Sequence, residues 1–357
     1  MPAVSPAAGA LAPGSGDDLP IIETIEVSKH FATGHGGLAR RHGGLRPTLK
    51  AVDGISLAIH RGETLALVGE TGSGKTTFGR LILGLYRPTS GDIRYRGTSI
   101  LDRRSEAARA VRRQVQGVFQ DPYSSLNPTM TVGQSLAEVL KVHNVVDRAC
   151  RADRVAELLS TVGLSPAQAG RRPVAFSGGE RQRVGIARAL AVQPEVIIAD
   201  EPLSALDLSI QAQVLNLMIK LQDERGLTYL FVTHDLDVAR HISQRTAVLY
   251  LGRVVEEAPT ADIFADPLHP YAQALVRAAP RLTTKRKAAK PALGGELPNA
   301  IDRPTGCHFH PRCPMVMPRC REEEPPLIRL PGGRTVACHL HGAAPGAPTL
   351  AAPQPPG

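Results

Sequence analysis

The stretch that decides the fold, residues 65–85, reads LALVGETGSGKTTFGRLILGL. Its first four residues are apolar and predict a buried strand, its glycine-rich middle predicts a loop, and its end predicts a helix. Residues 69–76 match the pattern G-x-x-x-x-G-K-[ST] in the strand, loop and helix context that a phosphate-binding loop requires. A glycine-rich turn with a chance lysine is the alternative, and this context disfavours it.

The loop is suited to bind the phosphate chain of a nucleotide. Glycines let the backbone fold around an anion, so that N–H groups and the N-terminus of the next helix point at it. Lys75 is expected to reach the β- and γ-phosphates, and Thr76 to offer its hydroxyl to Mg2+. The binding residues expected from this loop are Gly69, Glu70, Thr71, Gly72, Ser73, Gly74, Lys75, Thr76 and Thr77.

A pair of carboxylates follows a second apolar run. The stretch EVIIADEP, residues 195–202, places Asp200 and Glu201 where a buried strand ends, and open α/β sheets bind their ligands at that edge. Asp200 can hold Mg2+ through water, and Glu201 can polarise the water that attacks the γ-phosphate. Such a pair alone is as often a helix-terminal charge or a turn. Its weight comes from the phosphate loop earlier in the chain.

The hydrophobic pattern predicts an α/β fold. Short apolar runs, such as those at 63–69 and 228–233, alternate with segments of helical period, as in a sheet with crossover helices. Between these strands, one stripe of a helix collects four apolar residues. These are Val155, Leu158, Leu159 and Val162. We therefore expect a helical subdomain at about 122–190, inserted in the α/β core.

The ends of the chain differ from its middle. Residues 1–19 and 343–357 are rich in Pro, Ala and Gly, so we expect disordered tails that bury too little apolar surface to fold. From about residue 265 prolines and cysteines become frequent and periodic runs become rare, which predicts a boundary there. Cys150, in the helical segment, is expected to be a packed thiol.

Charge and hydropathy limit the compartment more than the function. The net charge of +9 at pH 7 would suit nucleic acid, an anionic membrane surface or phosphate ligands, and does not choose among them. The first residues lack the features of a secretory signal, and no apolar stretch approaches eighteen residues. We expect a cytoplasmic chain that does not itself span a membrane, where reducing conditions disfavour structural disulfides.

Further motifs resemble those of ATP-binding cassette (ABC) ATPases. In chain order they are Gln120 in VFQDPYSSLNP, the run FSGGERQRVGIARAL at 176–190, SALD ending at Asp207, and His234 in FVTHD. Several loosely specific motifs in the family's order are far stronger than any one alone, and the resemblance covers about residues 20–340. It implies an ABC-type P-loop ATPase core at 20–264, with the inserted α-helical subdomain and a small N-terminal antiparallel β subdomain.

The resemblance also implies a dimer. Ser177, Gly178 and Gly179 open a helix, and the amides of such a helix tip form an anion site. In ABC proteins this site contacts the γ-phosphate held by the opposite subunit, so two chains would enclose two ATP molecules head to tail. A lone chain is then expected to be a poor ATPase.

Four more residues take roles from the family. Gln120 would sense Mg2+ and the attacking water and link to a membrane partner, and His234 would contact the γ-phosphate. Asp207 would signal across the dimer, and Phe31 matches the aromatic residue that stacks on adenine. The alternatives are a loop amide for Gln120, a satisfied strand-end histidine for His234, a helix cap for Asp207 and a core ring for Phe31.

Three phrases narrow the resemblance to the ATPase subunits of dipeptide and oligopeptide importers. They are VFQDPYSSLNP, DPLHPYAQALVRAAP at 266–280 and GCHFHPRCPMVMPRC at 306–320. In that family a C-terminal extension, here at 265–342, carries four cysteines and in some members a 4Fe-4S cluster. The candidates are Cys307, Cys313, Cys320 and Cys338. The resemblance therefore implies an iron-sulfur cluster on these cysteines. The spacing lacks the C-x2-C pairs common in zinc sites, which disfavours Zn2+ without excluding it, and free or oxidised thiols are the other alternative.

The sequence therefore predicts an ATP-hydrolysing subunit, peripheral on the cytoplasmic face of the plasma membrane, that powers peptide import. The resemblance implies ATP and Mg2+ as cofactors. It implies a second ATPase subunit, two membrane permease subunits and an extracytoplasmic substrate-binding protein as partners, and no nucleic acid. A soluble ABC ATPase acting on nucleic acid or ribosomes is the alternative that the basic charge would allow. The single cassette and the lack of a long coiled-coil insertion disfavour it.

Overall fold

The structure is a computed structural model, and it describes residues 19–32, 48–102, 104–121, 126–278, 298 and 300–342. The two tails expected to be disordered, 1–19 and 343–357, lie outside the described residues except for Leu19. The glycine- and arginine-rich stretch at 33–47 also lies outside them.

An eight-stranded sheet forms the centre of the protein, in the order β11-β12-β10-β9-β3-β8-β7-β6. The strands from β9 to β6 pair in parallel, and β10, β12 and β11 continue the sheet antiparallel. The strands are β3 Thr64–Val68, β6 Val115–Val118, β7 Val196–Asp200, β8 Thr228–Thr233, β9 Arg245–Tyr250, β10 Arg253–Pro259, β11 Ile328–Arg329 and β12 Thr335–Val336.

The central strands are covered on both faces. Every residue of β3, β7 and β8 is buried, as expected for parallel strands between two layers. Along β7, Ile197 and Ala199 join a hydrophobic cluster formed with helices α4 to α7. The alternate residues Val196 and Ile198 join a second cluster on the other face. Side chains of β7 thus face both layers, and the strand ends in Asp200 at the carboxyl-end edge of the parallel strands.

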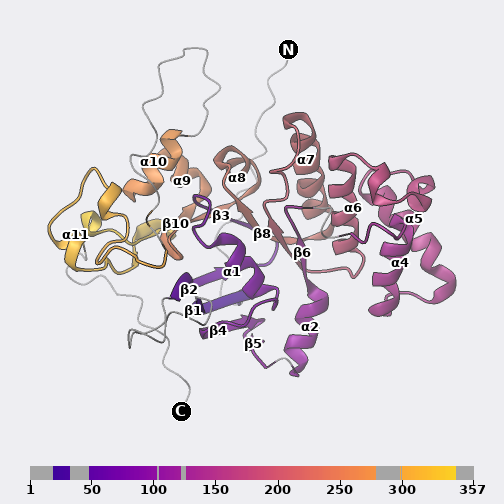
Figure 1. The fold of residues 1–357 in the computed structure, drawn as a ribbon, viewed down its shortest axis with the longest axis horizontal. Coiled ribbons are helices and arrows are strands. Elements are labelled where there is room, and N and C mark those ends of the chain that lie inside the picture. The colour runs from indigo at the N-terminus through magenta and orange to yellow at the C-terminus, as the bar shows by residue number, and fades with distance from the viewer. Residues whose placement is uncertain are drawn as a thin grey trace, which may run out of the picture.

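The second layer is a smaller antiparallel sheet in the order β2-β1-β4-β5. Its strands are β1 Ile22–Ala32, β2 Thr48–Ile59, β4 Ser90–Tyr95 and β5 Thr98–Ser99. Ile22, Val52 and Ile93 from this sheet share one hydrophobic cluster with Leu67 of β3 and Phe78 of helix α1, Lys75–Ile82. The small sheet therefore packs against β3 and α1. Figure 1 shows it below these elements, in indigo and purple.

Helices α4, α5 and α6 gather at one end of the molecule (Figure 1). The predicted apolar stripe is confirmed, because all four of its residues, from Val155 to Val162, are buried. Cys150 is exposed, so the prediction that it packs is wrong; it sits just before α5, outside the stripe. The helices are α2 Glu106–Gln114, α4 Val132–Val142, α5 Arg151–Thr161, α6 Gly178–Leu190, α7 Leu208–Arg225 and α8 Leu236–Ile242.

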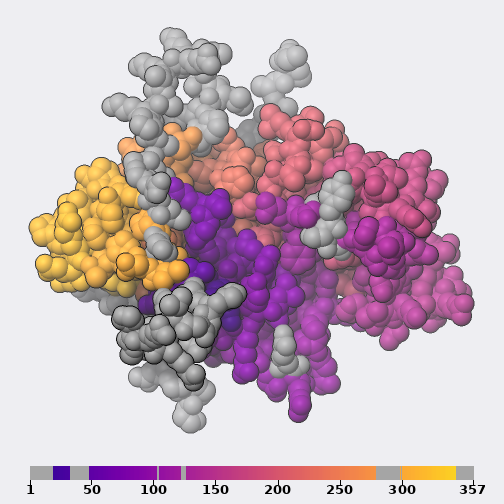
Figure 2. Space-filling model, in the orientation of Figure 1, coloured from indigo at the N-terminus to yellow at the C-terminus, as the bar shows by residue number. Residues whose placement is uncertain are grey.

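The C-terminal segment lies at the opposite end, in yellow in Figures 1 and 2. Its strand β12 pairs with β10 of the core sheet, with Val336 opposite Glu256. Helix α9, Thr260–Ala265, ends where the extension begins, and the extension contains α10 Pro270–Ala278 and α11 Arg319–Glu322. The short 3-10 helices of the chain are Arg148–Cys150, Pro166–Gly170, Pro173–Ala175, His310–Arg312, Pro331–Gly333 and His339–His341. No helix in the described ranges is both long and apolar enough to cross a membrane.

Candidate nucleotide-binding site

The phosphate loop joins β3 to α1, as the sequence predicts. Gly74 caps the start of α1 with φ 104°, a conformation that L side chains rarely adopt. A Cβ atom on Gly74 would lie 2.1 Å from the carbonyl oxygen of Ala51, and one on Gly69 would lie 2.2 Å from that of Leu249. The loop therefore passes so close to β2 and β9 that only glycine fits at its two ends.

Lys75, the first residue of α1, folds back into the loop. Its Nζ donates hydrogen bonds to the carbonyl oxygens of Gly69 at 2.7 Å and Glu70 at 3.0 Å. Burial lowers the pKa of Lys75, while the carboxylates of Glu201, Asp200 and Glu70 oppose that shift. The Lys75 ammonium group is thus attracted by three nearby carboxylates. Its two hydrogen bonds to loop carbonyls keep the loop folded around it.

Thr76 and Asp200 meet although 124 residues separate them. Asp200 ends β7, and its Oδ1 accepts a hydrogen bond of 2.9 Å from the Thr76 hydroxyl. Burial raises the pKa of Asp200, and the Thr76 bond and Arg80 act against that shift. A hydroxyl and a carboxylate at hydrogen-bond distance are hard oxygen ligands of the kind Mg2+ prefers. The residues present fit the magnesium ion that the sequence predicts.

Glu201 and His234 lie together at the ends of neighbouring strands. Glu201 has φ 47°, and its N–H donates to the carbonyl oxygen of Val232 at 2.9 Å. This bond anchors a left-handed turn that is costly for a residue other than glycine. The carboxylate Oε2 of Glu201 lies 3.3 Å from Nδ1 of His234, whose side chain is half exposed. Lys75, Asp200 and Glu201 therefore converge where β3, β8 and β7 end side by side.

The residues of the predicted helix-tip site lie elsewhere on the chain. Ser177 caps α6 through a capping box, in which its hydroxyl accepts from the N–H of Glu180 and the Glu180 carboxylate accepts from the N–H of Ser177. This second bond is the main cause of the lowered pKa of Glu180. Ser177 is exposed, and no hydrogen bond or ion pair within the described ranges joins Ser177, Gly178 or Gly179 to the phosphate loop. Asp207, also exposed, precedes α7.

Gln120 and Phe31 lie outside the phosphate loop, each near the end of a strand. Gln120 follows β6 and is exposed. Phe31 lies near the end of β1 and is half buried. Its ring meets the ring of Tyr86 edge to face, with centroids 5.6 Å apart, and Nζ of Lys29 lies 5.1 Å from its centroid. Phe31 is thus an aromatic residue on strand β1 whose ring packs against Tyr86, a few residues after the end of α1.

The predicted iron-sulfur centre is not supported. Cys307, Cys313, Cys320 and Cys338 do come together, lining one cavity of about 10 Å³. However, among the described residues no three His, Cys, Asp or Glu side chains are arranged to hold a metal ion. The prediction of a 4Fe-4S cluster on these cysteines is therefore wrong for this structure, and the Zn2+ alternative has no support either.

The chemistry of the segment explains the error. Burial raises the pKa of Cys307 to about 11 and also raises those of Cys313 and Cys338, as for thiols packed among apolar groups. Nearby imidazoles are hydrogen-bonded to backbone carbonyls, His310 to Cys307 and His339 to Glu323. Cysteine is also among the residues that proteins most often bury, so spacing alone does not distinguish a packed thiol from a ligand.

Sequence reasoning missed two residues that touch the phosphate loop. Arg312, in the C-terminal extension, binds the carboxylate of Glu70 through both terminal guanidinium nitrogens, Nη1 and Nη2. The hydroxyl of Tyr271 accepts a hydrogen bond from the N–H of Glu70. Both partners are more than 200 residues from the loop, and no spacing rule would have found them.

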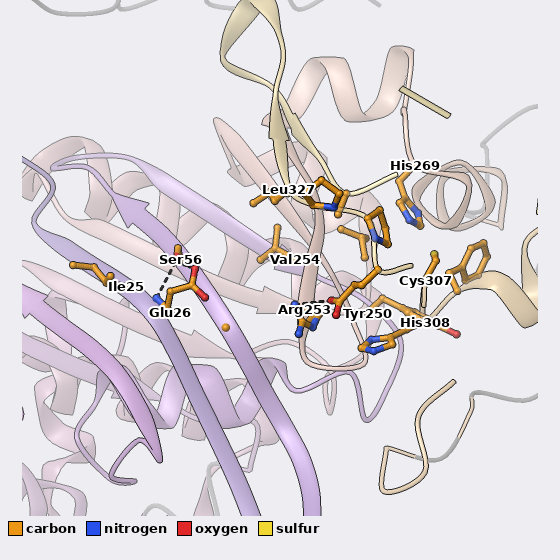
Figure 3. A pocket seen from close by; sticks show the side chains of 17 residues that line it. Ile25, Glu26, Ser56, Tyr250, Arg253, Val254, His269, Cys307, His308 and Leu327 are labelled. Carbon is orange, nitrogen blue, oxygen red and sulfur yellow. Dashed lines mark hydrogen bonds and ion pairs between the residues drawn. The ribbon is translucent and has the colours of Figure 1, made fainter. Parts of the chain in front are cut away.

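A separate cavity of about 460 Å³ lies between the small sheet and the extension. Figure 3 shows Glu26 and Ser56 on the strand side, and Tyr250, Arg253, Cys307 and His308 on the other. Its lining includes no residue of the phosphate loop or of the two acidic positions after β7.

The fold and the site together define an ABC-type ATPase: a phosphate loop after β3, with Asp200 and Glu201 closing its open edge. Comparisons with known proteins agree. Residues 52–204 match the family described as ABC transporter, and residues 255–320 match the one described as oligopeptide/dipeptide transporter, C-terminal region. Among solved structures, an ATP-binding cassette dimer with ADP and phosphate is 30% identical with a TM-score of 0.56, over 67% of this chain and 98% of that one.

Curated relatives narrow the class. A probable peptide ABC transporter ATP-binding protein of Sinorhizobium fredii is 50% identical over 84% of each chain. An oligopeptide transport ATP-binding protein of Bacillus subtilis is 48% identical over 90% of this chain and 97% of its own, and a dipeptide transport ATP-binding protein of Escherichia coli is 43% identical over 89% and 94%. The chain belongs to the family of ATP-binding proteins of oligopeptide and dipeptide ABC transporters.

Proposed function

We propose that this chain hydrolyses ATP to power the import of dipeptides or oligopeptides through a membrane ABC transporter. The observation that carries the proposal is the convergence of Lys75, Asp200 and Glu201 at the ends of three neighbouring strands. The peptide-transporter extension on the same chain, and relatives named for peptide transport, support the cargo class.

Each residue of the site has a task. Lys75 exchanges its loop carbonyls for the β- and γ-phosphates, because a charged phosphate oxygen is a stronger partner than a neutral carbonyl. Thr76, Asp200 and Gln120 hold Mg2+, which neutralises phosphate charge when bound. Glu201 orients and polarises the attacking water, and its short distance to His234 keeps the histidine facing the γ-phosphate.

Hydrolysis in this proposal needs a second ATPase subunit. The α6 tip at Ser177, Gly178 and Gly179 is separate from the phosphate loop of the same chain, which supports its use on the nucleotide of an opposing chain. Asp207, exposed beside α7, then faces the dimer interface, and Phe31 stacks on adenine. Closing and reopening this dimer supplies the motion that drives alternating access in two permease subunits, fed by an extracytoplasmic substrate-binding protein.

A groove offers a place for the membrane partner. A cavity of about 660 Å³ runs from the end of α1 across α2 to Gly117 and Phe119, next to Gln120. Its lining is mainly apolar, with Leu85 and Tyr86 at its α1 side. We place a cytoplasmic segment of a permease subunit here, which puts the chain on the cytoplasmic face of the plasma membrane. The proposed domains are an ABC domain at 20–264, with its helical subdomain at about 122–190, and the extension at 265–342.

Glu201→Gln tests the proposed mechanism. The amide keeps the size of the side chain but cannot act as a base, so kcat is expected to fall by about 100- to 10,000-fold with ATP binding retained. The variant should also accumulate as an ATP-bound dimer in size-exclusion chromatography. Glu224→Gln, on the exposed face of α7, is the matched control. ATP turnover by Glu201→Gln equal to that of the unaltered protein would contradict the proposal.

Peptide import is measured separately from turnover. The chain is reconstituted in proteoliposomes with two permease subunits and a substrate-binding protein, and uptake of labelled di- and oligopeptides is followed with and without internal ATP. ATP-dependent uptake that is lost in Lys75→Ala supports the cargo class. ATP turnover without any peptide uptake, together with salt-sensitive binding of nucleic acid, would favour a soluble ABC ATPase instead.

A further inference from the structure

We propose that Arg312 of the C-terminal extension is a positioning residue for ATP: it holds the phosphate loop in place and neutralises the acid within it, Glu70. The inference rests on the proposed function only in that the loop binds ATP. It gives the extension a part in the nucleotide site of its own chain.

The contact between the two residues is bidentate. Nη1 and Nη2 of Arg312 donate to the two carboxylate oxygens of Glu70 at 2.7 Å and 2.9 Å, across 242 residues of sequence. The Arg312 side chain is 4% exposed and that of Glu70 is 27% exposed. A bidentate pair with one partner buried is stronger and more directional than a surface ion pair.

The other polar groups of Glu70 are held as well. Its N–H donates to the Tyr271 hydroxyl at 2.9 Å, and its carbonyl oxygen accepts from Nζ of Lys75 at 3.0 Å. One residue of the loop is thus fixed through its side chain, its amide and its carbonyl. When Lys75 turns to a phosphate, the contacts with Arg312 and Tyr271 remain, together with the hydrogen bond that the Glu70 carbonyl accepts from the N–H of Ser73 at 3.1 Å.

Aromatic rings keep these two contacts rigid. Tyr250, Tyr271 and Phe309 pack against one another with centroids 4.6 to 5.4 Å apart. The Arg312 guanidinium lies 6.0 Å from the Tyr250 centroid, within the range of a cation–π contact. Tyr250 comes from β9 of the core, whereas Tyr271, on α10, and Phe309 both come from the extension. Tyr250 and Cys307 also border the cavity in Figure 3. Through the aromatic cluster and the Arg312–Glu70 pair, the extension contacts the core beside the phosphate loop.

The charge of Glu70 gives the pair its effect on ATP. A carboxylate in a loop that receives a polyanion repels it, and the guanidinium cancels that repulsion. Removing Arg312 alone leaves the carboxylate unpaired beside the phosphates. Removing the charge of Glu70 as well removes the repulsion. A contact that only fastened the extension would behave differently, because either single change would break it equally.

The experiment measures the ATP dissociation constant with a fluorescent ATP analogue, and KM and kcat, for Arg312→Gln, Glu70→Gln and the double variant. Arg312→Gln is expected to weaken ATP binding about 10-fold, the size of one lost charge interaction near a surface. Glu70→Gln is expected to weaken it about 3-fold, by loss of the anchor alone. The double variant should match Glu70→Gln, and the change should appear in KM more than in kcat.

Two further variants sharpen the test. Arg319→Gln, which removes an exposed ion pair with Glu323 in the same extension, is the control and should bind ATP like the unaltered protein. Arg312→Lys keeps the charge and should retain affinity within about 3-fold, which also answers the objection that Arg312→Gln is misfolded. Normal ATP binding by Arg312→Gln, or weak binding by Arg312→Lys, would overturn the inference. So would a double variant that binds ATP as weakly as Arg312→Gln or more weakly. Failure of the unaltered protein to bind ATP would instead overturn the proposed function.

Discussion

Glu201, the residue proposed to polarise the attacking water, also has a strained backbone conformation. Its φ of 47° belongs to a region that residues other than glycine rarely occupy, and its amide is tied to Val232 of β8. Such strain persists only where the surrounding structure fixes it. Here it aims the carboxylate at the edge where His234 and the end of β7 meet.

At the same scale, His269 gives a pH dependence. It is 1% exposed, and burial, aided by His341, lowers its pKa to about 3. The unfolded chain takes up a proton near pH 6.5, whereas the folded chain does not until far lower pH. Because the unfolded state binds more protons in this range, stability is expected to fall as pH drops below 6.5, by about 1.4 kcal/mol per pH unit for this histidine.

Urea unfolding of the unaltered protein and of His269→Asn between pH 5 and 8 checks this. Asparagine can still accept the N–H of Tyr271, which His269 accepts at 3.0 Å through Nδ1. Carboxylates contribute equally to both proteins, so the difference between the two slopes isolates His269. Identical slopes would show that His269 is not the source.

At the scale of elements, the phosphate loop is shaped by what it passes. Gly74→Ala would place a methyl group 2.1 Å from the carbonyl oxygen of Ala51 at a φ of 104°. The protein is expected to fold with its loop displaced and to bind ATP about 10-fold or more weakly, because the methyl group forces the loop away from β2. Titration calorimetry with ATP measures the loss.

Gly62→Ala is the control for this prediction. Gly62 also has a positive φ, of 74°, but a Cβ there meets no atom within 4 Å. It should lower thermal stability slightly and leave ATP affinity intact. Equal loss of affinity in the two variants would mean that strain, and not the clash with β2, is responsible.

Across the whole molecule, Glu256 ties the extension to the core. It is fully buried on β10, and its carboxylate accepts from the N–H groups of Leu268 and His269 at 2.7 to 3.0 Å and from Arg334 at 3.4 Å. Glu256→Ala removes the acceptor of the N–H groups of Leu268 and His269 and one of the two acidic partners of Arg334, which keeps Asp266. Stability is expected to fall by about 3–5 kcal/mol, with the extension becoming sensitive to protease.

Chemical denaturation and limited proteolysis with mass mapping test this, with Glu322→Ala on the exposed side of α11 as control. Early cleavage confined to residues beyond 265 is the expected pattern. If Glu256→Ala unfolds at the same denaturant concentration as the control, the extension is held by other contacts.

Local features were predictable because their signals are local. The phosphate loop follows from glycines whose positions the backbone demands, and the buried stripe on α5 follows from helical period. The two carboxylates after β7 were predictable from an apolar run that ends in acids. Both Thr76 and Asp200 were assigned to Mg2+ from the sequence, but the direct hydrogen bond between them was not predictable, since it spans 124 residues.

The sequence by itself determined the phosphate loop, the alternation of strands and helices in the core and the family, because each is written in the spacing of neighbouring residues. Only the tertiary structure decided that Arg312 meets Glu70, that β12 continues the core sheet, and that the four cysteines are packed thiols around a small cavity. The reason is physical: contacts between distant segments depend on how whole layers pack, and that packing leaves no periodic signal in the chain.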